Sequence, residues 1–176
     1  MSIIIGIALA ALTIILRLVP HSPNFVPVAA LALWAGAYLP KKWGVLVPMA
    51  VMFISDAIIG FYDWRLMLVV YASFAIMFFV GMWVRNNKSV SRVVLGSLSG
   101  SMFFFLATNF AVWAMSSWYA HNFTGLMEAY AMGAPFFRNT VLGDLFYNGM
   151  FFGVYALAEA FIRRKSSVFD LGAHVG

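Results

Sequence analysis

The sequence contains no cysteine and very little charge. Only 10% of its 176 residues are Asp, Glu, Lys or Arg, and only six are acidic, whereas soluble domains average about 25% charged residues. The lack of cysteine excludes disulfide bonds, thiolate metal sites and cysteine catalysis. The scarcity of charge, together with the high apolar content, excludes a disordered chain, a nucleic-acid-binding module and an ordinary cytosolic enzyme.

The sequence instead contains long runs of apolar residues. Hydrophobic residues make up 64% of the chain and aromatic residues 18%, and the mean hydropathy is +0.92. A helix that spans a bilayer needs about 20 residues, so six such helices would use about 120 and leave about 56 for connections. The runs are continuously apolar and do not alternate at a period of two, which argues against a β-barrel.

We therefore predict an all-α membrane protein with one domain, residues 1–165, built as a bundle of six transmembrane helices. The predicted helices are 2–19, 26–39, 44–61, 66–84, 93–118 and 139–162. Pro48 is expected to kink the third helix. A connection of about 20 residues, from Tyr119 to Arg138, separates the last two helices, and connections of this length are often lids or binding loops. Residues 166–176 are predicted to form a cytoplasmic tail.

Basic residues are distributed unevenly between the two ends of the predicted bundle. The end that carries both termini holds Lys41, Lys42, Arg85, Lys88, Arg92, Arg163, Arg164 and Lys165, and the opposite end holds only Arg17, Arg65 and Arg138. Cytoplasmic loops carry the excess of Lys and Arg in most membrane proteins. The N- and C-termini are therefore predicted to be cytoplasmic.

Several charged and amide side chains lie inside the predicted helices, where a charge costs a few kcal/mol unless it has a partner or a function. They come from four helices and share one depth near the outer side: Arg17, Asp56, Asn109, Asp144 and Asn148. We predict that they line an outward-facing polar pocket. The alternative is structural, with Arg17 paired to Asp56 or to Asp144, although hydrogen bonds within membranes average only about 0.6 kcal/mol.

The outer side is also rich in aromatic and hydrogen-bonding residues. Aromatic walls with a few placed polar groups are typical of small-molecule sites. The further candidate binding residues are Asn24, Trp64, Trp113, Trp118, His121, Phe136, Phe137, Arg138 and Asn139. An interfacial aromatic belt would explain single Trp or Tyr residues but not the whole long connection. His21 and His121 show no metal-ligand motif, so no metal site is predicted.

Two further patterns concern packing and partners. Glu159 and Arg163 have the spacing of an ion pair on one helix face, and small residues recur at four-residue spacing in several runs, which lets helices approach closely. Gly6 and Ala10 on the first helix are predicted to dock a partner protein. The sequence shows no hydrolytic, redox or nucleotide-binding motif, so we predict neither an enzyme nor a cofactor, and nucleic acid is not expected as a partner.

Four segments carry a resemblance to a known family. They are Asn24-Phe25-Val26-Pro27-Val28, the stretch from Gly44 through Pro48 to Asp56 and Gly60, the stretch Thr108–Trp113, and Pro135–Thr140 followed by Gly143-Asp144-Leu145. In these segments and in its six-helix layout, the chain resembles the substrate-binding S subunits of energy-coupling factor transporters. It is most similar to an uncharacterised family of small six-helix bacterial membrane proteins related to them.

The resemblance implies a multi-pass subunit of the bacterial inner membrane. Such a subunit binds a vitamin-like or other small micronutrient at the outer face under loops. It then carries the solute inward with a separate energising module, a transmembrane coupling subunit with two ATPases that docks on small residues of helix 1. Arg17, Asp56, Asn109 and Asp144 would bind the polar groups of the solute, and aromatic side chains would stack on it.

Three other functions stay open at this point. A stand-alone carrier, proton-coupled or facilitative, could use Asp56 and Asp144 as a proton relay. A structural subunit of a membrane complex would need no solute. A membrane enzyme acting on lipid is disfavoured because no nucleophile or metal cluster supports it. Within the S-subunit resemblance, the N-terminal Met1-Ser2-Ile3 lacks the histidine of nickel and cobalt importers, and the absence of cysteine disfavours the cobalamin-binding branch.

Overall fold

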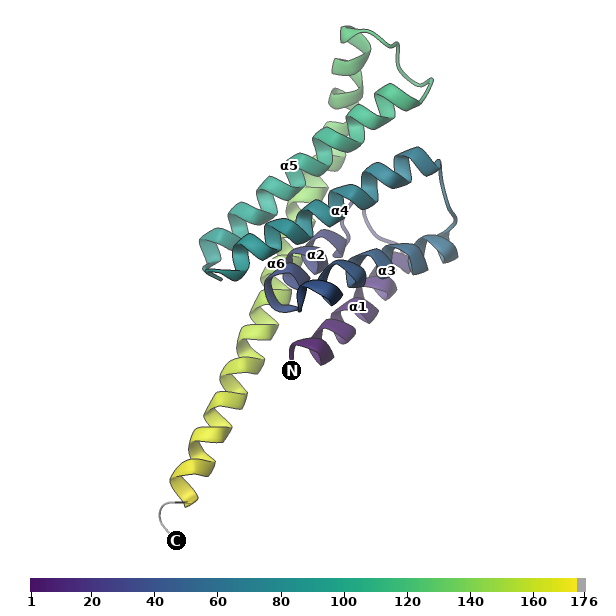
Figure 1. The fold of residues 1–176 in the computed structure, drawn as a ribbon. Helices are drawn as coiled ribbons and strands as arrows, with labels where there is room; N and C mark the ends of the chain where they lie inside the picture. The colour runs from purple at the N-terminus through teal and green to yellow at the C-terminus, as the bar shows by residue number, and fades with distance from the viewer. Residues whose placement is uncertain (174–176) are drawn as a thin grey trace.

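The computed structural model describes the backbone of residues 1–173 and the side chains of residues 1–164. Within that part of the chain all regular structure is helical. The six helices are α1 (Ser2–Leu18), α2 (Val28–Tyr38), α3 (Lys41–Ile59), α4 (Trp64–Arg85), α5 (Val90–Met115) and α6 (Phe123–Ala173). Figure 1 shows them as an oblique bundle in which α6 runs the whole length of the molecule. The predicted all-α, six-helix fold is confirmed.

Four of these helices, α3 to α6, are long and apolar enough to cross a membrane, and α1 and α2 are shorter apolar helices. The 11 residues of α2 rise about 16 Å, against a hydrocarbon core about 30 Å thick. The expectation of six spanning helices is therefore confirmed by length and composition for only four. Large apolar side chains such as Ile4, Ile58, Leu68 and Leu157 are exposed, which is rare in soluble monomers and suits a lipid environment.

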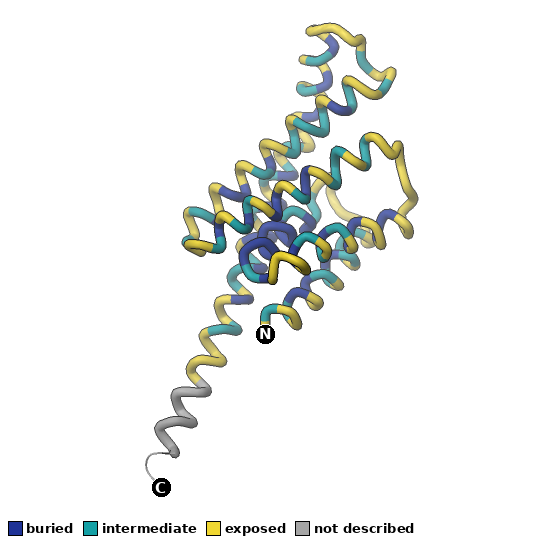
Figure 2. The backbone as a smooth tube through the Cα atoms, viewed as in Figure 1, coloured by how far each residue is buried: buried dark blue, intermediate teal, exposed yellow. Residues whose placement is uncertain are grey.

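The short helix α2 forms the centre of the bundle. Every residue from Ala30 to Ala35 is fully buried, and Figure 2 shows α2 in dark blue between the other helices. A helix that is apolar all round is stable only where neighbours cover every face. A Cβ added at Gly36 would lie 2.2 Å from the Phe78 carbonyl oxygen of α4, so the two helices approach at backbone distance. A continuous apolar run does not distinguish such a helix from a lipid-facing one.

The C-terminal end of α2 is capped from outside the helix. The guanidinium of Arg85, at the end of α4, donates hydrogen bonds to the carbonyl oxygens of Gly36 and Leu39. The last carbonyl groups of a helix have no partner within it and need one when they are buried. Arg85 therefore allows α2 to end inside the protein.

The largest correction concerns α6. It begins at Phe123 and not at residue 139, so the predicted long connection shrinks to the short link between Met115 and Phe123. The Asn122 Oδ1 accepts a hydrogen bond of 2.9 Å from the Gly125 N–H and caps the helix start. Pro135 lies inside the helix, where its missing N–H is tolerated despite the usual tendency to break or kink. The helix also continues past residue 166, where a tail was predicted, and residues 174–176 lie outside the described part.

Candidate functional site

The polar side chains of the helices form two separate clusters. In the first, which we call the ion-pair cluster (Arg17, Ser55, Asp56 and Tyr71), Arg17 Nη2 lies 2.8 Å from Asp56 Oδ1. The Tyr71 hydroxyl donates to Asp56 Oδ2 at 2.9 Å, and Arg17 Nη1 donates to Ser55 Oγ. Both carboxylate oxygens of Asp56 thus have partners, and only 2% of the residue is exposed.

A tyrosine in the α3–α4 connection lies close to this cluster. Burial, with the nearby Asp56 carboxylate adding to it, raises the pKa of Tyr62 to about 12, although Arg17 acts in the opposite direction. The ion-pair cluster joins α1, α3 and α4 and is closed to a ligand.

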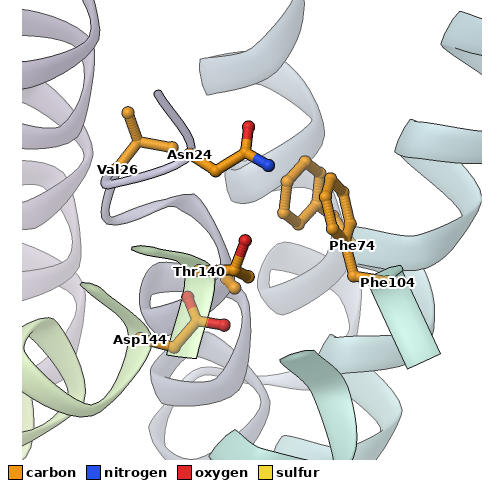
Figure 3. A pocket seen from close by; sticks show the side chains of 7 residues that line it. Asn24, Val26, Phe74, Phe104, Thr140 and Asp144 are labelled. Carbon is orange, nitrogen blue, oxygen red and sulfur yellow. The ribbon is translucent and has the colours of Figure 1, made fainter. Parts of the chain in front are cut away.

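The second cluster surrounds a pair of adjoining cavities at the end of the bundle nearest the α5–α6 connection. We call the pair the hairpin-end chamber. Its smaller part, about 40 Å³, is lined by Asn24, Val26, Ala29, Phe74, Phe104, Thr140 and Asp144. Its larger part, about 180 Å³, is lined by Pro23, Asn24, Phe104, Phe105, Thr108, Asn109, Val112, Gly133, Phe136, Phe137 and Thr140. The two parts share Asn24, Phe104 and Thr140, and Figure 3 shows the smaller one.

The connection between α1 and α2 covers this chamber. Asn24 has a positive φ of 61°, a conformation in which Asn is enriched among non-glycine residues, and its side chain extends toward Phe74 and Phe104 (Figure 3). The side chain of Asn139 on α6 donates to the Pro23 carbonyl oxygen at 3.1 Å. The loop is thereby tied to α6, and it holds the Asn24 amide at the chamber wall.

Asp144 on α6 supplies the only carboxyl group among the residues that line the chamber. It is 2% exposed, and its Oδ2 accepts a hydrogen bond of 2.6 Å from Ser101 Oγ on α5. Within residues 1–164, no hydrogen bond to its Oδ1 accompanies this one. Asp144 lines the cavity, so a hydrogen-bond donor or cationic group of a ligand would find a free acceptor at this oxygen.

Aromatic rings and one amide form the rest of the wall. The rings of Phe74 and Phe104 stack with centroids 5.4 Å apart, and those of Phe105 and Phe137 lie 4.7 Å apart. Asn109 Nδ2 donates to the Phe105 carbonyl oxygen at 2.8 Å. A Cβ added at Gly133 would lie 2.2 Å from Asn109 Oδ1, so the glycine leaves room for the amide. The chamber combines apolar rings with a few placed polar groups, as small-molecule sites do.

The structure places the predicted binding residues in different parts of the bundle. Asn24, Asn109, Phe136, Phe137 and Asp144 line the chamber, whereas Arg17 and Asp56 lie in the ion-pair cluster. The expectation of one pocket lined by all the intramembrane polar residues therefore does not hold. Between the two alternatives for Arg17, the structure shows pairing with Asp56.

The other predicted residues hold the α5–α6 connection or lie at the surface. Trp113 Nε1 donates to the Ala120 carbonyl oxygen at 3.0 Å, and the His121 ring contacts Trp113 edge-on with centroids 5.9 Å apart. Trp64, Trp118 and Arg138 are exposed and are not among the residues that line the chamber. Asn148 lies one helical turn beyond Asp144, where its side-chain NH₂ donates to Ser97 Oγ. The predicted ion pair of Glu159 with Arg163 is present, at 2.6 Å.

The residues predicted from the sequence did not include several chamber and neighbouring residues, among them Phe74, Phe104, Ser101 and Thr140. One signal could have found two of them. Thr140, Asp144 and Asn148 follow one another at four-residue spacing, and so do Ser97 and Ser101. Residues four apart share one face of a helix, so the sequence predicts both polar faces. It does not predict which two helices face each other.

The expected docking face on α1 is covered within the same chain. Gly6 is buried, and a Cβ added there would lie 3.3 Å from the side chains of Trp34 and Leu39. Ala10 packs against the same core. In this conformation α2 therefore covers Gly6, and Ala10 stays partly exposed. The docking of a partner through these two residues stays a prediction. Within residues 1–164, no three His, Cys, Asp or Glu side chains lie together as a metal site would need.

The chain belongs to a family of unknown function, DUF6580, whose model matches residues 1–167. Comparison with the curated proteins and with the solved structures gave no match.

Proposed function

We propose that the protein is a membrane-embedded binding subunit for a small, vitamin-like solute, held in the hairpin-end chamber and carried inward with a separate energising module. The observation that carries the proposal is Asp144. This carboxyl group lies at a cavity wall, has a single hydrogen bond among the described residues, and is surrounded by aromatic rings and amides. In a membrane, an ionisable residue of this kind marks a functional site by default.

The chemistry of the wall limits the class of solute. An engineered cavity of about 150 Å³ holds benzene, so the larger part of the chamber, about 180 Å³, suits a solute with one ring. Phe104 and Phe137 would pack against that ring. A hydrogen-bond donor or cationic group on the solute would pair with Asp144, and the amides of Asn24 and Asn109 would bind its remaining polar groups.

The distribution of charge supports an orientation. Basic residues gather at the end of the bundle that carries the N-terminus and the α2–α3 and α4–α5 turns, and fewer lie at the opposite end. With the excess of Lys and Arg on the cytoplasmic side, the hairpin-end chamber opens toward the outer face of the bacterial inner membrane. The energy for uptake would come from a transmembrane coupling subunit with ATPases, since the sequence shows no nucleotide-binding motif.

Native mass spectrometry of the purified protein, with extraction and identification of any bound small molecule, tests the proposal. We expect one solute per protein, lost in Asp144→Ala and in Asn109→Ala. Asn87→Ala, at an exposed position of the α4–α5 turn, is the matched control and keeps the solute. Retention of the solute at full stoichiometry in a monodisperse Asp144→Ala protein would contradict the assignment.

If the protein is isolated empty, a thermal-shift panel of vitamins and related single-ring compounds provides the second measurement. We expect at least one compound to raise the unfolding temperature of the natural protein and to leave that of Asp144→Ala unchanged, because only bound ligand stabilises the folded state. A panel without any such compound, on top of an empty spectrum, would favour a structural subunit.

A further inference from the structure

A second cavity lies between α5 and α6, farther from the α5–α6 connection than the hairpin-end chamber. Its volume is about 290 Å³, and it is lined by residues of α2, the α4–α5 turn, α5 and α6, among them Tyr38, Lys88, Ser97, Asn148, Gly149 and Gly153. We call it the termini-end cavity. Its α5 residues lie between Val90 and Ser97, whereas those of the hairpin-end chamber lie between Phe104 and Val112. The seven residues from Ser97 to Phe104 rise about 10 Å, so the two spaces are separated along α5.

Two features make this cavity more than a packing gap. A Cβ added at Gly149 or Gly153 would meet nothing within 4 Å, and Gly149 is itself exposed, so the cavity is open to the outside of the bundle along α6. Asn148 is 1% exposed, and its Oδ1 is a buried atom without a hydrogen-bond partner in the described part of the chain. A buried amide oxygen without a donor costs free energy, and this one belongs to a cavity wall.

A line of buried polar groups joins the two spaces. Ser101 Oγ donates to Asp144 Oδ2 at 2.6 Å and also lies 3.0 Å from the Ser97 carbonyl oxygen. Asn148 Nδ2 then donates to Ser97 Oγ at 3.1 Å. All four residues are at most 2% exposed. Serine and asparagine side chains also form ordinary hydrogen bonds between membrane helices, but here the line of four groups runs from the wall of one cavity to the wall of the other.

We propose that the seam between α5 and α6 is a route through the chain for a small polar solute. The hairpin-end chamber receives the solute from one face of the membrane, and the termini-end cavity releases it toward the other. The hydrogen bond between Ser101 and Asp144 closes the route between them in this conformation. The inference rests on the proposed function in taking the hairpin-end chamber as the entry site.

The absence of cysteine from the sequence makes a direct test possible. Single cysteines are introduced at Thr108, in the chamber, and at Gly149, in the termini-end cavity. Sealed vesicles of each orientation are treated with a membrane-impermeant, cationic methanethiosulfonate. We expect Thr108→Cys to react from one face only and Gly149→Cys from the opposite face only. The controls are Met102→Cys and Leu142→Cys, whose native side chains are 47% and 50% exposed on the outside of the bundle, and they react from neither face.

The closure is tested by adding Ser101→Ala, which removes the hydroxyl that bonds to Asp144 and changes little volume. We expect Gly149→Cys to react from the chamber face at least tenfold faster than without the second substitution. If Ser101→Ala does not fold, Asp144→Ala removes the same hydrogen bond from the α6 side and replaces it in the test. Monodispersity in detergent is checked for every variant.

Three results would overturn the route. They are reaction of Thr108→Cys and Gly149→Cys from the same face, no reaction of Gly149→Cys while Thr108→Cys reacts, and an unchanged chamber-face rate in both folded opening variants. The labelling does not need a bound solute. A protein that binds no solute would overturn the proposed function, but the face from which each cysteine reacts could still be interpreted.

Discussion

The two buried aspartates of the bundle differ in their partners and not in their burial. Asp56 and Asp144 are each 2% exposed. Asp56 receives hydrogen bonds on both oxygens, from Arg17 and Tyr71, whereas Asp144 receives only that of Ser101 within the described residues and lies beside a cavity. Burial therefore does not distinguish the two carboxyl groups. They differ in the number of hydrogen-bond partners and in the cavity beside Asp144, and the proposed binding role rests on that difference.

The largest effect on stability is expected when the ion pair is broken from one side. Arg17→Ala leaves the Asp56 carboxylate buried without its cation, and such changes cost about 3–5 kcal/mol. The free energy of unfolding, measured by titration with a denaturing detergent, checks this. The double variant Arg17→Met with Asp56→Leu is the control, because it removes both charges and should recover much of the loss. A double variant no more stable than Arg17→Ala would contradict a structural pair.

The positions of most helices followed directly from the sequence, but the start of α6 did not. The stretch from Tyr119 to Arg138 contains Gly125, Gly133 and Pro135, which favour a loop, but it also contains good helix formers, and Asn122 provides the cap. Gly133 is explained by a tertiary contact, since it makes room for the side chain of Asn109. A glycine required for close packing and a glycine that ends a helix look the same in one sequence.

A smaller loss is expected from Tyr71→Phe, which removes the second partner of Asp56 while Arg17 stays. A hydrogen bond to a charged group contributes about 1.5–3 kcal/mol, so the unfolding free energy should fall by that amount. Solute stoichiometry, measured on the same protein, should not change, because Tyr71 lies outside the chamber lining. Tyr130→Phe, whose hydroxyl donates to a carbonyl oxygen at an exposed position, is the matched control with a smaller effect. Loss of the solute in Tyr71→Phe would show that the ion-pair cluster also contributes to binding.

The position of the polar residues within helices was predictable from the sequence, but their pairing was not. The expectation that Asp56 and Asp144 share one depth stays a prediction, and for Asp144 it was counted from a helix start at residue 139, whereas α6 begins at Phe123. Pairing depends on which helices touch. α1 packs against α3, and α5 packs against α6, so Arg17 reaches Asp56 while Ser101 reaches Asp144. Neither hydropathy nor spacing specifies such neighbours when every helix is apolar all round.

On the chamber side, Asn24 is expected to show an effect of about 1 kcal/mol. Its φ of 61° costs a residue such as alanine roughly 1–2 kcal/mol, while glycine adopts it readily. Asn24→Ala should therefore lower the unfolding temperature, and Asn24→Gly should restore it. Both variants lack the amide, so both should bind the solute more weakly. Full binding by Asn24→Gly would remove the amide from the site and leave it only a role in the loop.

Replacing Asp with Asn is expected to have different consequences at the two carboxyl groups. At position 144 it should cause the smallest loss of stability of all these variants. Asn is nearly isosteric with Asp, and at position 144 its amide oxygen can still accept the Ser101 hydrogen bond, so the unfolding free energy of Asp144→Asn should change by less than about 1 kcal/mol. The solute should nevertheless be lost, because the substitution replaces the second carboxyl oxygen, which would accept a hydrogen bond from the solute, with an NH₂ group that cannot accept one. Asp56→Asn should instead cost about 3–5 kcal/mol, because Arg17 is left buried without its anion, and a folded remainder should keep the solute. Detergent titration and native mass spectrometry of both variants measure the two quantities side by side. Equal losses of stability at the two positions would show that Asp144 is structural, and that the space beside it is not a binding site.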